Sequence, residues 1–216
     1  MNFDSRIIEQ LKAELQKPLP GETAQYRMAP SYRPRLSAAD IAAQNPRLGG
    51  VMVLLYESNG LLKTVFTKRR EYEGVHSGQM SFPGGKKDDT DSDLTATALR
   101  ETQEEIGIDG NNIELLGKLS ELYIPPSNFL VHPAVGFTPA IESFTPQDKE
   151  VAEIVEIPLG FFLNEQNIHP QTEIKLFNGH TVRAPAYIYE SHVIWGATAI
   201  VLSEFSFILQ KAIKQR

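Results

Sequence analysis

The chain of 216 residues contains no cysteine. This absence excludes disulfide bonds, thiolate zinc sites and a cysteine nucleophile. An uninterrupted run of 18 apolar residues is also missing, and residues 1–15 are charged and amphipathic rather than built around the apolar core of a signal peptide. We therefore expect a cytoplasmic protein with no membrane partner, a location with which the missing disulfides are compatible.

Positive charge is scarce as well. The 21 lysines and arginines stand against 27 aspartates and glutamates, which gives a net charge of −6. A general nucleic-acid binder normally carries a basic face, so we expect no nucleic-acid partner. A small anionic substrate is compatible with this charge if a metal ion neutralises it locally. The length suits one well-buried core, and we expect a helix and an irregular arm in residues 1–48, followed by one compact unit, residues 49–216.

Residues 81–108 hold the densest set of functional residue types. A proline–glycine–glycine turn is followed by an acidic linker and by an amphipathic helix that we expect to end at Gly107. Successive helical residues are about 100° apart, so Glu101, Glu104 and Glu105 share one face of that helix. The core-facing stripe is expected on roughly the opposite side, at Thr95, Leu99, Thr102 and Ile106.

The three glutamates admit two interpretations. The first is a solvated acidic face, which is common on surface helices. The second is a cation site, because three like charges on one face repel each other and hard oxygen ligands suit Mg²⁺ or Mn²⁺. The glycine turn ahead of the helix favours the second interpretation, as does Arg100, which can pair with a carboxylate and hold the loop.

These residues carry a resemblance to a known family. Gly85 and the segment Arg100-Glu101-Thr102-Gln103-Glu104-Glu105-Ile106-Gly107-Ile108 resemble the Nudix box, G-x5-E-x7-R-E-U-x-E-E-x-G-U, in which U is apolar. Thr102 stands where U is usually aliphatic. Asp91 stands at the position of the first Glu, and eight residues rather than seven separate it from Arg100.

The resemblance implies an α/β fold, a Nudix-like α/β/α sandwich with a mixed sheet, and a divalent cofactor, Mg²⁺ or Mn²⁺. It implies catalysis by Glu101, Glu104 and Glu105, with Glu101 and Glu105 as principal metal ligands and Glu104 as ligand or base. The carbonyl of Gly85 is a further expected ligand. Residues expected to orient this set are Arg100 and Asp91. One more carboxylate from outside the box often joins such sites, and the candidates are Glu142, Asp148, Glu150 and Glu153.

The segment upstream of the box is similar to a signature of the coenzyme A pyrophosphatases within that family, L-L-T-x-R-[SA]-x3-R-x3-G-x3-F-P-G-G. The matching stretch is Val65-Phe66-Thr67-Lys68-Arg69-Arg70, with Gly78 and Phe82-Pro83-Gly84-Gly85 in register. Two departures concern Arg70, which replaces a small residue, and Gly74, which replaces a second arginine. Coenzyme A differs from other nucleotides by its 3′-phosphate, and the residues expected to bind substrate are Arg69, Arg70 and Asn128.

The resemblance leads us to expect hydrolysis of coenzyme A or an acyl derivative to 3′,5′-ADP and (acyl-)4′-phosphopantetheine. A second hypothesis keeps the reaction but takes ADP-ribose, NADH or a dinucleoside polyphosphate as substrate. A third is a Nudix domain that senses a nucleotide without cleaving it. His76 is expected to form hydrogen bonds rather than act as a base, and a homodimer is plausible for this fold.

Hydrophobic periodicity outside the box predicts the remaining elements. Helices are expected at residues 3–16, 38–43, 158–163 and 195–213, the last with Trp195 in its core stripe. Strands are expected at residues 49–56, 61–67, 113–122 and 131–139, whereas residues 146–156 show mixed spacing. A hairpin of residues 172–177 and 181–188 is expected around Asn178-Gly179, with a type I′ turn.

Overall fold

The computed structural model describes residues 4–70 and 77–214. Within these residues the larger sheet has the strand order β3-β2-β1-β7-β5, with β4 on β1, β6 on β7 and β8 on β2. Its strands are β1 (Arg47–Ser58), β2 (Leu61–Arg69), β3 (Met80–Ser81), β4 (Gly84–Lys86), β5 (Glu114–Lys118), β6 (Leu122–Ile124), β7 (Phe129–Thr138) and β8 (Val151–Pro158). Because β1 and β7 are parallel and the other pairs are antiparallel, the sheet is mixed.

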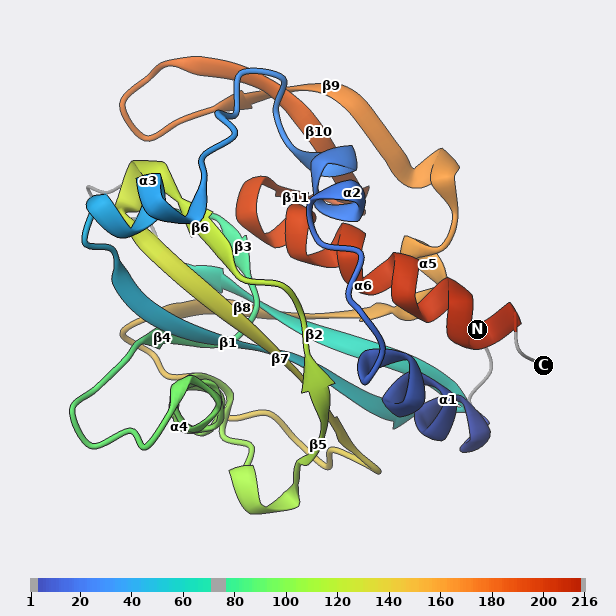
Figure 1. The fold of residues 1–216 in the computed structure, drawn as a ribbon. Helices are drawn as coiled ribbons and strands as arrows, with labels where there is room; N and C mark the ends of the chain where they lie inside the picture. The colour runs from blue at the N-terminus through green and yellow to red at the C-terminus, as the bar shows by residue number, and fades with distance from the viewer. Residues whose placement is uncertain (1–3, 71–76, 215–216) are drawn as a thin grey trace.

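Helices and a second sheet complete the fold (Figure 1). The helices are α1 (Arg6–Leu15), α2 (Glu22–Gln25), α3 (Ala38–Ala43), α4 (Leu94–Ile106), α5 (Leu159–Phe162) and α6 (Gly196–Lys214). Short 3₁₀ helices are η1 (Tyr26–Met28), η2 (Gly110–Asn112), η3 (Pro125–Ser127) and η4 (Glu165–Asn167). Strands β9 (Ile168–Lys175), β10 (Thr181–Tyr189) and β11 (His192–Trp195) form a separate antiparallel sheet.

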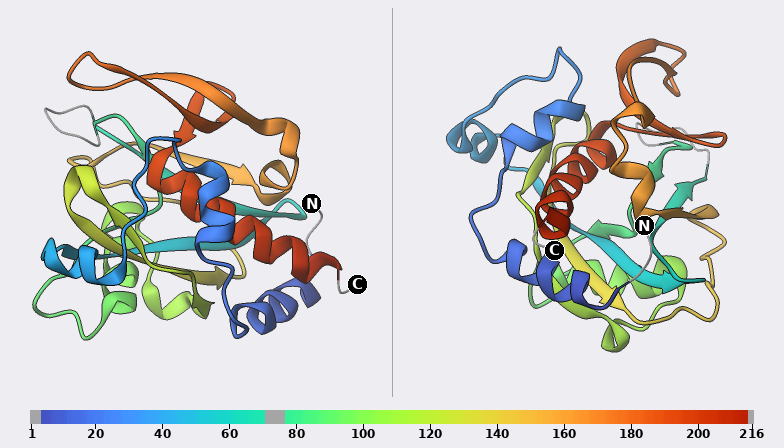
Figure 2. Two further views of the ribbon diagram at one scale, coloured as in Figure 1. Left: turned by 45° about the horizontal axis from the view of Figure 1, so that its top comes forward. Right: turned by 90° about the vertical axis from the view of Figure 1, so that its right-hand side faces the viewer.

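The central strand β1 is buried on both faces, which explains its almost continuous apolar sequence. Successive side chains of a strand point to opposite faces. Met52 and Leu54 accordingly belong to the hydrophobic cluster that includes residues of α4, whereas Val53 and Leu55 belong to the cluster that includes residues of α6. Figures 1 and 2 show α4 on one side of the sheet and α6 on the other. The predicted α/β/α sandwich with a mixed sheet is thus confirmed.

Helix α4 begins and ends at sequence signals. Asp93 caps its N-terminus, where the side chain accepts hydrogen bonds from the backbone of Thr95 and Ala96, both at 2.8 Å. Gly107 ends it in the left-handed conformation, with a φ of 78°. The helix therefore ends at the predicted glycine.

Three of the four residues of the predicted stripe, Thr95, Thr102 and Ile106, are buried on α4, and the buried face extends beyond them. Thr97, Ala98 and Glu105 are buried, whereas Leu99 is only partly buried. The reason is a close approach to β1, since a Cβ on Gly50 would lie 2.9 Å from the backbone nitrogen of Ala98. Small side chains must therefore face the sheet, and the buried face is broader than the stripe that the apolar spacing suggested.

The N-terminal arm is joined to the core through a buried carboxylate on α6. Glu204 has no exposed surface and accepts hydrogen bonds from the Gly21 backbone (3.0 Å), the Gln25 amide (3.0 Å) and both the backbone (3.2 Å) and the hydroxyl (2.6 Å) of Ser120. Residues of α1 also belong to the same hydrophobic cluster as α6. A boundary near residue 48 therefore stays a prediction, and the arm packs as part of the core.

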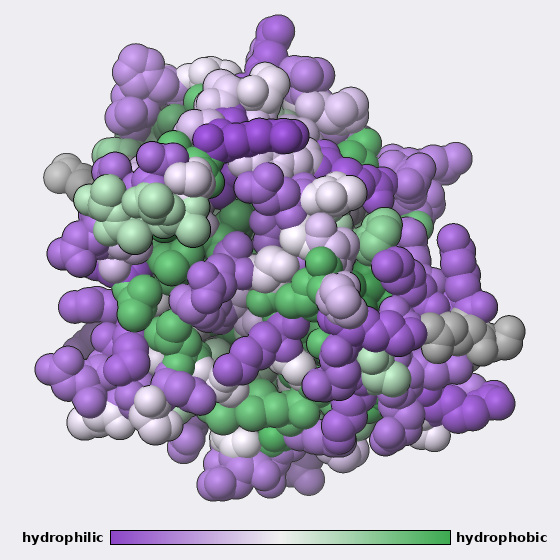
Figure 3. Space-filling view, in the orientation of Figure 1, coloured by the Kyte–Doolittle hydropathy of each residue, from purple (hydrophilic) through white to green (hydrophobic). Residues whose placement is uncertain are grey.

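Helix α6 is the one described helix that is long and apolar enough to cross a membrane, although 67% of its most apolar 18-residue window is buried inside the protein. The sequence interpretation did not foresee this, because Ser203 and Glu204 interrupt the apolar run. On the face shown in Figure 3, hydrophilic residues predominate and apolar ones form small patches between them.

Several local predictions needed correction. Trp195 ends β11 and is not on the helix, which begins at Gly196. The turn after β9 is not type I′, because that turn needs positive φ at both central residues and Asn178 has none, whereas Gly179 has a φ of 80°. The expected strand at 113–122 is divided into β5 and β6, and the segment of mixed spacing contributes a strand, β8.

Candidate active site

The glycine turn of the box lies directly under Glu101. Strand β4 pairs with β1 so that Gly85 is opposite Gly50. A Cβ on Gly85 would lie 2.5 Å from the Cδ atom of Glu101 and 2.6 Å from its Oε2. Only glycine leaves the space that the Glu101 carboxylate occupies, which gives this position a physical reason independent of any motif.

Glu105 is a buried carboxylate, with 2% of its surface exposed. Its Oε2 accepts hydrogen bonds from the Gly84 backbone (3.3 Å) and the Thr67 hydroxyl (3.4 Å), and its Oε1 lies 3.9 Å from the Arg69 guanidinium. Burial raises the pKa of Glu105 to about 7, an effect that Arg69 opposes and that the charge of Glu101 increases. Such a carboxylate can both bind a cation and exchange a proton near neutral pH.

Arg100 ties the box loop to α4. Its Nε and Nη2 donate to the two carboxylate oxygens of Asp91 at 3.0 and 3.1 Å, and Nη2 also donates to the Lys86 carbonyl at 3.1 Å. Its Nη1 lies 2.9 Å from a carboxylate oxygen of both Glu101 and Glu104. The guanidinium lowers the pKa of Asp91 below its usual value. The structure thus brings Asp91 and Arg100 together despite the shorter acid and the inserted residue.

The three box glutamates differ in their surroundings. Glu104 has 49% of its side chain exposed and contacts Arg100, whereas the side chain of Glu101 is 14% exposed. Burial raises the pKa of Glu101, Arg100 opposes this rise, and the charge of Glu104 adds to it. In residues 4–70 and 77–214, no three His, Cys, Asp or Glu side chains converge in a metal-ligand arrangement, and each box glutamate instead lies beside an arginine.

The chemistry of the donors nevertheless fits a divalent cation. Glu101 and Glu105 offer hard oxygens, and the charge of Glu101 raises the pKa of Glu105, as expected for acids that lie close enough to bind one cation. The expected carbonyl ligand is less well placed, because the oxygen of Gly85 lies 2.7 Å from the position of a Cβ on Gly49 and therefore faces β1. The N–H and C=O of one strand residue point to the same edge of the strand. The N–H of Gly84 donates to Glu105, so the carbonyl of Gly84 faces the acids as well.

Glu150 stands out among the four acids outside the box. Its charge raises the pKa of both Glu101 and Glu105. The segment before β8 runs along the end of α4, where the Gln147 backbone donates to the Glu105 carbonyl at 3.0 Å. Glu153 instead pairs with His192 at 3.1 Å. The sequence did not choose among these acids because their position depends on how β8 pairs with β2.

The residues expected to bind substrate are not equivalent. Arg69 lies beside Glu105, and the exposed Arg70 has its backbone N–H bonded to the Glu150 carbonyl at 3.1 Å. Asn128 accepts from the Tyr123 hydroxyl and donates to the Gln44 carbonyl, both at 3.0 Å, so both ends of its side chain are engaged within the protein. These contacts favour a structural role for Asn128. Gly74 and His76 lie outside the described residues.

Comparisons with known proteins give consistent results. A family model described as "NUDIX domain" matches residues 46–176. A relative from Yersinia pestis, "Uncharacterized Nudix hydrolase NudL", is 39% identical over 140 residues, which are 64% of this chain and 68% of the relative.

Solved structures with the same type of domain are also similar. A MutT/nudix family protein from Enterococcus faecalis is 21% identical with a TM-score of 0.46, covering 99% of this chain and 74% of that one. The NUDIX domain of Shewanella oneidensis NrtR, in complex with ADP ribose, is 19% identical with a TM-score of 0.44, covering 58% and 85%.

Proposed function

The chain belongs to the NUDIX domain family and is a hydrolase of that family, and from this premise we propose that it cleaves the diphosphate bond of coenzyme A or an acyl-coenzyme A. Water adds to one phosphorus, the bridging P–O bond breaks, and the products are 3′,5′-ADP and (acyl-)4′-phosphopantetheine. The observation that carries the proposal is the position of Glu101 and Glu105 against the Gly84-Gly85 turn, with Arg69 of the upstream signature 3.9 Å from Glu105.

Each side chain has a role in this proposal. Glu101 and Glu105 would hold a divalent ion, Mg²⁺ or Mn²⁺, with the Gly84 carbonyl rather than the Gly85 carbonyl as a further donor. When bound, such an ion supplies charge neutralisation at the diphosphate and lowers the pKa of water. The half-exposed Glu104 takes the proton of the attacking water.

The surrounding residues orient this set. Arg100 fixes Glu101 and joins the loop through Asp91. Arg69 supplies a positive charge beside the acids, where an anionic diphosphate would otherwise be repelled. Glu150 is the additional acid from outside the box, because its charge acts on both Glu101 and Glu105.

A substrate panel tests the proposal. Purified protein is incubated with Mg²⁺ or Mn²⁺ and with coenzyme A, acetyl-coenzyme A, ADP-ribose, NADH or a dinucleoside polyphosphate, and the products are separated by chromatography. We expect 3′,5′-ADP from the coenzyme A species. Turnover of another diphosphate alone would reject the assignment of substrate but keep the reaction class.

A second substrate class has one observation in its favour. Gly74 replaces the second arginine of the coenzyme A signature, which points to another nucleoside diphosphate derivative such as ADP-ribose, NADH or a dinucleoside polyphosphate. Glu105→Gln separates both enzyme proposals from a nucleotide sensor. For an enzyme the variant binds its ligand without hydrolysing it, whereas a sensor shows no hydrolysis in the wild type either.

The role of Glu150 has its own experiment. Glu150→Gln removes the charge beside the box acids, and we expect kcat to fall by about 10². Glu142→Gln is the matched control, since Glu142 is also an exposed acid between β7 and β8. An equal effect of the two substitutions would contradict a specific role for Glu150.

A further inference from the structure

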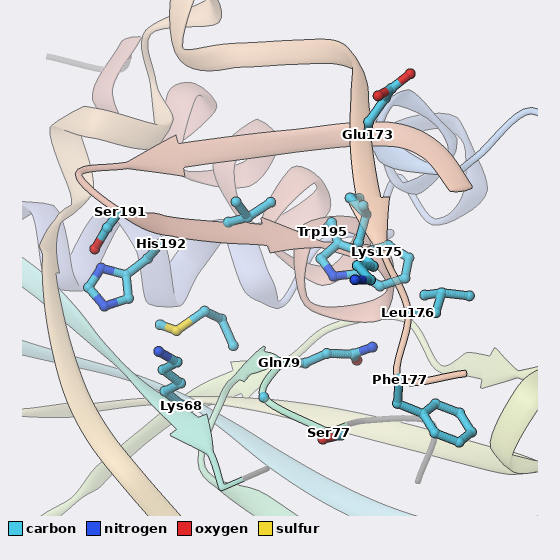
Figure 4. A pocket seen from close by; sticks show the side chains of 14 residues that line it. Lys68, Ser77, Gln79, Glu173, Lys175, Leu176, Phe177, Ser191, His192 and Trp195 are labelled. Carbon is cyan, nitrogen blue, oxygen red and sulfur yellow. The ribbon is translucent and has the colours of Figure 1, made fainter. Parts of the chain in front are cut away.

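A second cavity lies on the far side of β2 from the box glutamates. It has a volume of about 290 Å³ and is bordered by β2 and β3 of the larger sheet and by the smaller sheet (Figure 4). Lys68 and Met80 line it from the larger sheet, and Lys175, His192 and Trp195 line it from the smaller one. The volume is at the lower end for small-molecule sites, enough for one ring and one phosphate.

The cavity and the candidate active site share the end of β2. Thr67 pairs with Ser81 and Lys68 with Met80 across β2 and β3. The Thr67 hydroxyl contacts Glu105 on one face, so the next pair, Lys68 and Met80, faces the cavity on the other. Since four residues span at most about 14 Å, Met80 lies within that distance of Gly84. A ligand with its diphosphate at the box glutamates would therefore have its other end within reach of the cavity.

The lining combines positive charge with aromatic surface. Lys68 and Lys175 supply two ammonium groups in a protein whose net charge is −6. Among the described residues, the one acid in the wall is Glu173, which is bound by Arg183 at 2.6 Å and points away from the cavity in Figure 4. Lysines bind phosphate as point charges, and an indole ring stacks on a flat heterocycle. Trp195 supplies that ring.

His192 lines the cavity and pairs with a carboxylate. Its Nε2 lies 3.1 Å from the Glu153 carboxylate, whereas its Nδ1 has no hydrogen-bond partner in the described part of the chain. Buried polar atoms are nearly always paired in native proteins. Because Nδ1 is itself buried, it does not face the cavity, and the charged and aromatic side chains that can contact a ligand there are Lys68, Lys175 and Trp195.

We propose that this cavity binds the phosphorylated adenosine end of the substrate, with Lys68 and Lys175 on its 3′-phosphate and Trp195 against the adenine ring. The assignment rests on the proposed function, because only a substrate of the coenzyme A type brings a 3′-phosphate. It also explains how the chain recognises that phosphate without the second arginine of the upstream signature, which Gly74 replaces.

The single tryptophan provides a direct assay, because Trp195 is the only tryptophan of the chain. The probe is adenosine 3′,5′-bisphosphate, added in the presence of a chelator so that no metal ion recruits it to the box glutamates. We expect Trp195 fluorescence to change on binding, and the bisphosphate to bind about tenfold more tightly than 5′-AMP, which lacks the 3′-phosphate.

Lysine variants locate the phosphate. Lys68→Ala should weaken bisphosphate binding about tenfold, and the more exposed Lys175→Ala about threefold, while both leave 5′-AMP affinity nearly unchanged. Lys214→Ala, which removes an exposed lysine at the opposite end of α6, is the matched control. The absence of a fluorescence change, or equal weakening for both nucleotides, would overturn the proposal.

Kinetics connect the cavity to the reaction. With Lys68→Ala, KM for coenzyme A should rise about tenfold at unchanged kcat, while KM for dephospho-coenzyme A stays the same. Bisphosphate binding without this difference in KM would reject the cavity as part of the substrate site. If the wild type hydrolyses no coenzyme A species, the proposed function fails, and the fluorescence titration still decides whether the cavity recognises the 3′-phosphate.

Discussion

Substitutions at two facing glycines can separate effects on the fold from effects on the proposed metal site. Glycine to alanine should have opposite effects at the two positions. Gly85 and Gly50 are opposite each other in the β4–β1 pair, and neither has a positive φ. At Gly85 a new Cβ meets only the end of the Glu101 side chain, whose Cδ is 2.5 Å away. That carboxylate can rotate away, so Gly85→Ala should leave the fold intact and displace Glu101, which we propose as a metal ligand.

At Gly50 the obstacle is backbone. A Cβ there would lie 2.9 Å from the Ala98 nitrogen and closer still to the Leu94 carbonyl, so α4 itself must move away from the sheet. Overpacking of this kind costs about 3 kcal/mol. At about 3 °C per kcal/mol for a chain of this size, Gly50→Ala should lower Tm by about 10 °C.

For Gly85→Ala we expect the reverse pattern. Alanine restricts the unfolded chain and adds about 0.5 kcal/mol of stability, so Tm should change by no more than about 2 °C. A displacement of Glu101 by about 1 Å should lower kcat/KM about 10²-fold. Thermal unfolding by circular dichroism and hydrolysis assays over a range of Mg²⁺ concentrations measure the two effects. Equal loss of Tm in both variants, or full activity in Gly85→Ala, would refute the placement of Glu101 on Gly85.

Three further predictions concern buried or paired carboxylates. Folding without metal raises the pKa of Glu105 from 4.5 to about 7, so the stability of the metal-free protein is highest below about pH 4.5 and is lost as pH rises through 7. Glu105→Gln removes this charge. It should therefore stabilise the metal-free protein by about 3 kcal/mol at about pH 8 and not at about pH 4, as measured by Tm. Asp91→Asn weakens the ion pair with Arg100. It should lower the free energy of unfolding in urea by about 1–2 kcal/mol and kcat/KM about tenfold. An unchanged kcat/KM would show that activity does not need the loop to be fixed to Arg100. Glu204→Gln places an amide donor among the donors of the N-terminal arm and Ser120. It should lower the free energy of unfolding by about 3 kcal/mol, as measured by Tm, while kcat is retained. A loss of kcat at unchanged Tm would contradict a purely structural role.

The sequence predicted those parts of the fold in which local signals and tertiary packing agree. Strand β1 is apolar because it is buried on both faces, and α4 begins and ends at its own capping residues, Asp93 and Gly107. The burial of Glu105 was not predictable from helical periodicity. It results from the packing of Glu105 against Gly84 and Thr67, which depends on the position of the sheet.

Features that depend on strand pairing were also beyond the sequence. Glu150 could not be separated from the neighbouring acids, because its proximity to the box glutamates depends on the register of β8 against β2. Trp195 was assigned to the wrong element because its spacing matches the apolar stripe of α6, although Gly196 starts the helix one residue later. The sequence therefore contained no signal for the cavity that Trp195 lines.

The tolerance of the box to its inserted residue follows from the chemistry of arginine. A guanidinium has five donors in one plane, and Arg100 uses them on the loop acid, the Lys86 carbonyl and two helix glutamates. Asp91 is one methylene shorter than glutamate, and the additional residue supplies chain length with which the loop still reaches Arg100 at 3.0 Å. Lengthening a loop by one residue costs little entropy. The loop can therefore vary as long as it returns one carboxylate to Arg100, whereas Gly85 cannot vary because its space is filled by Glu101.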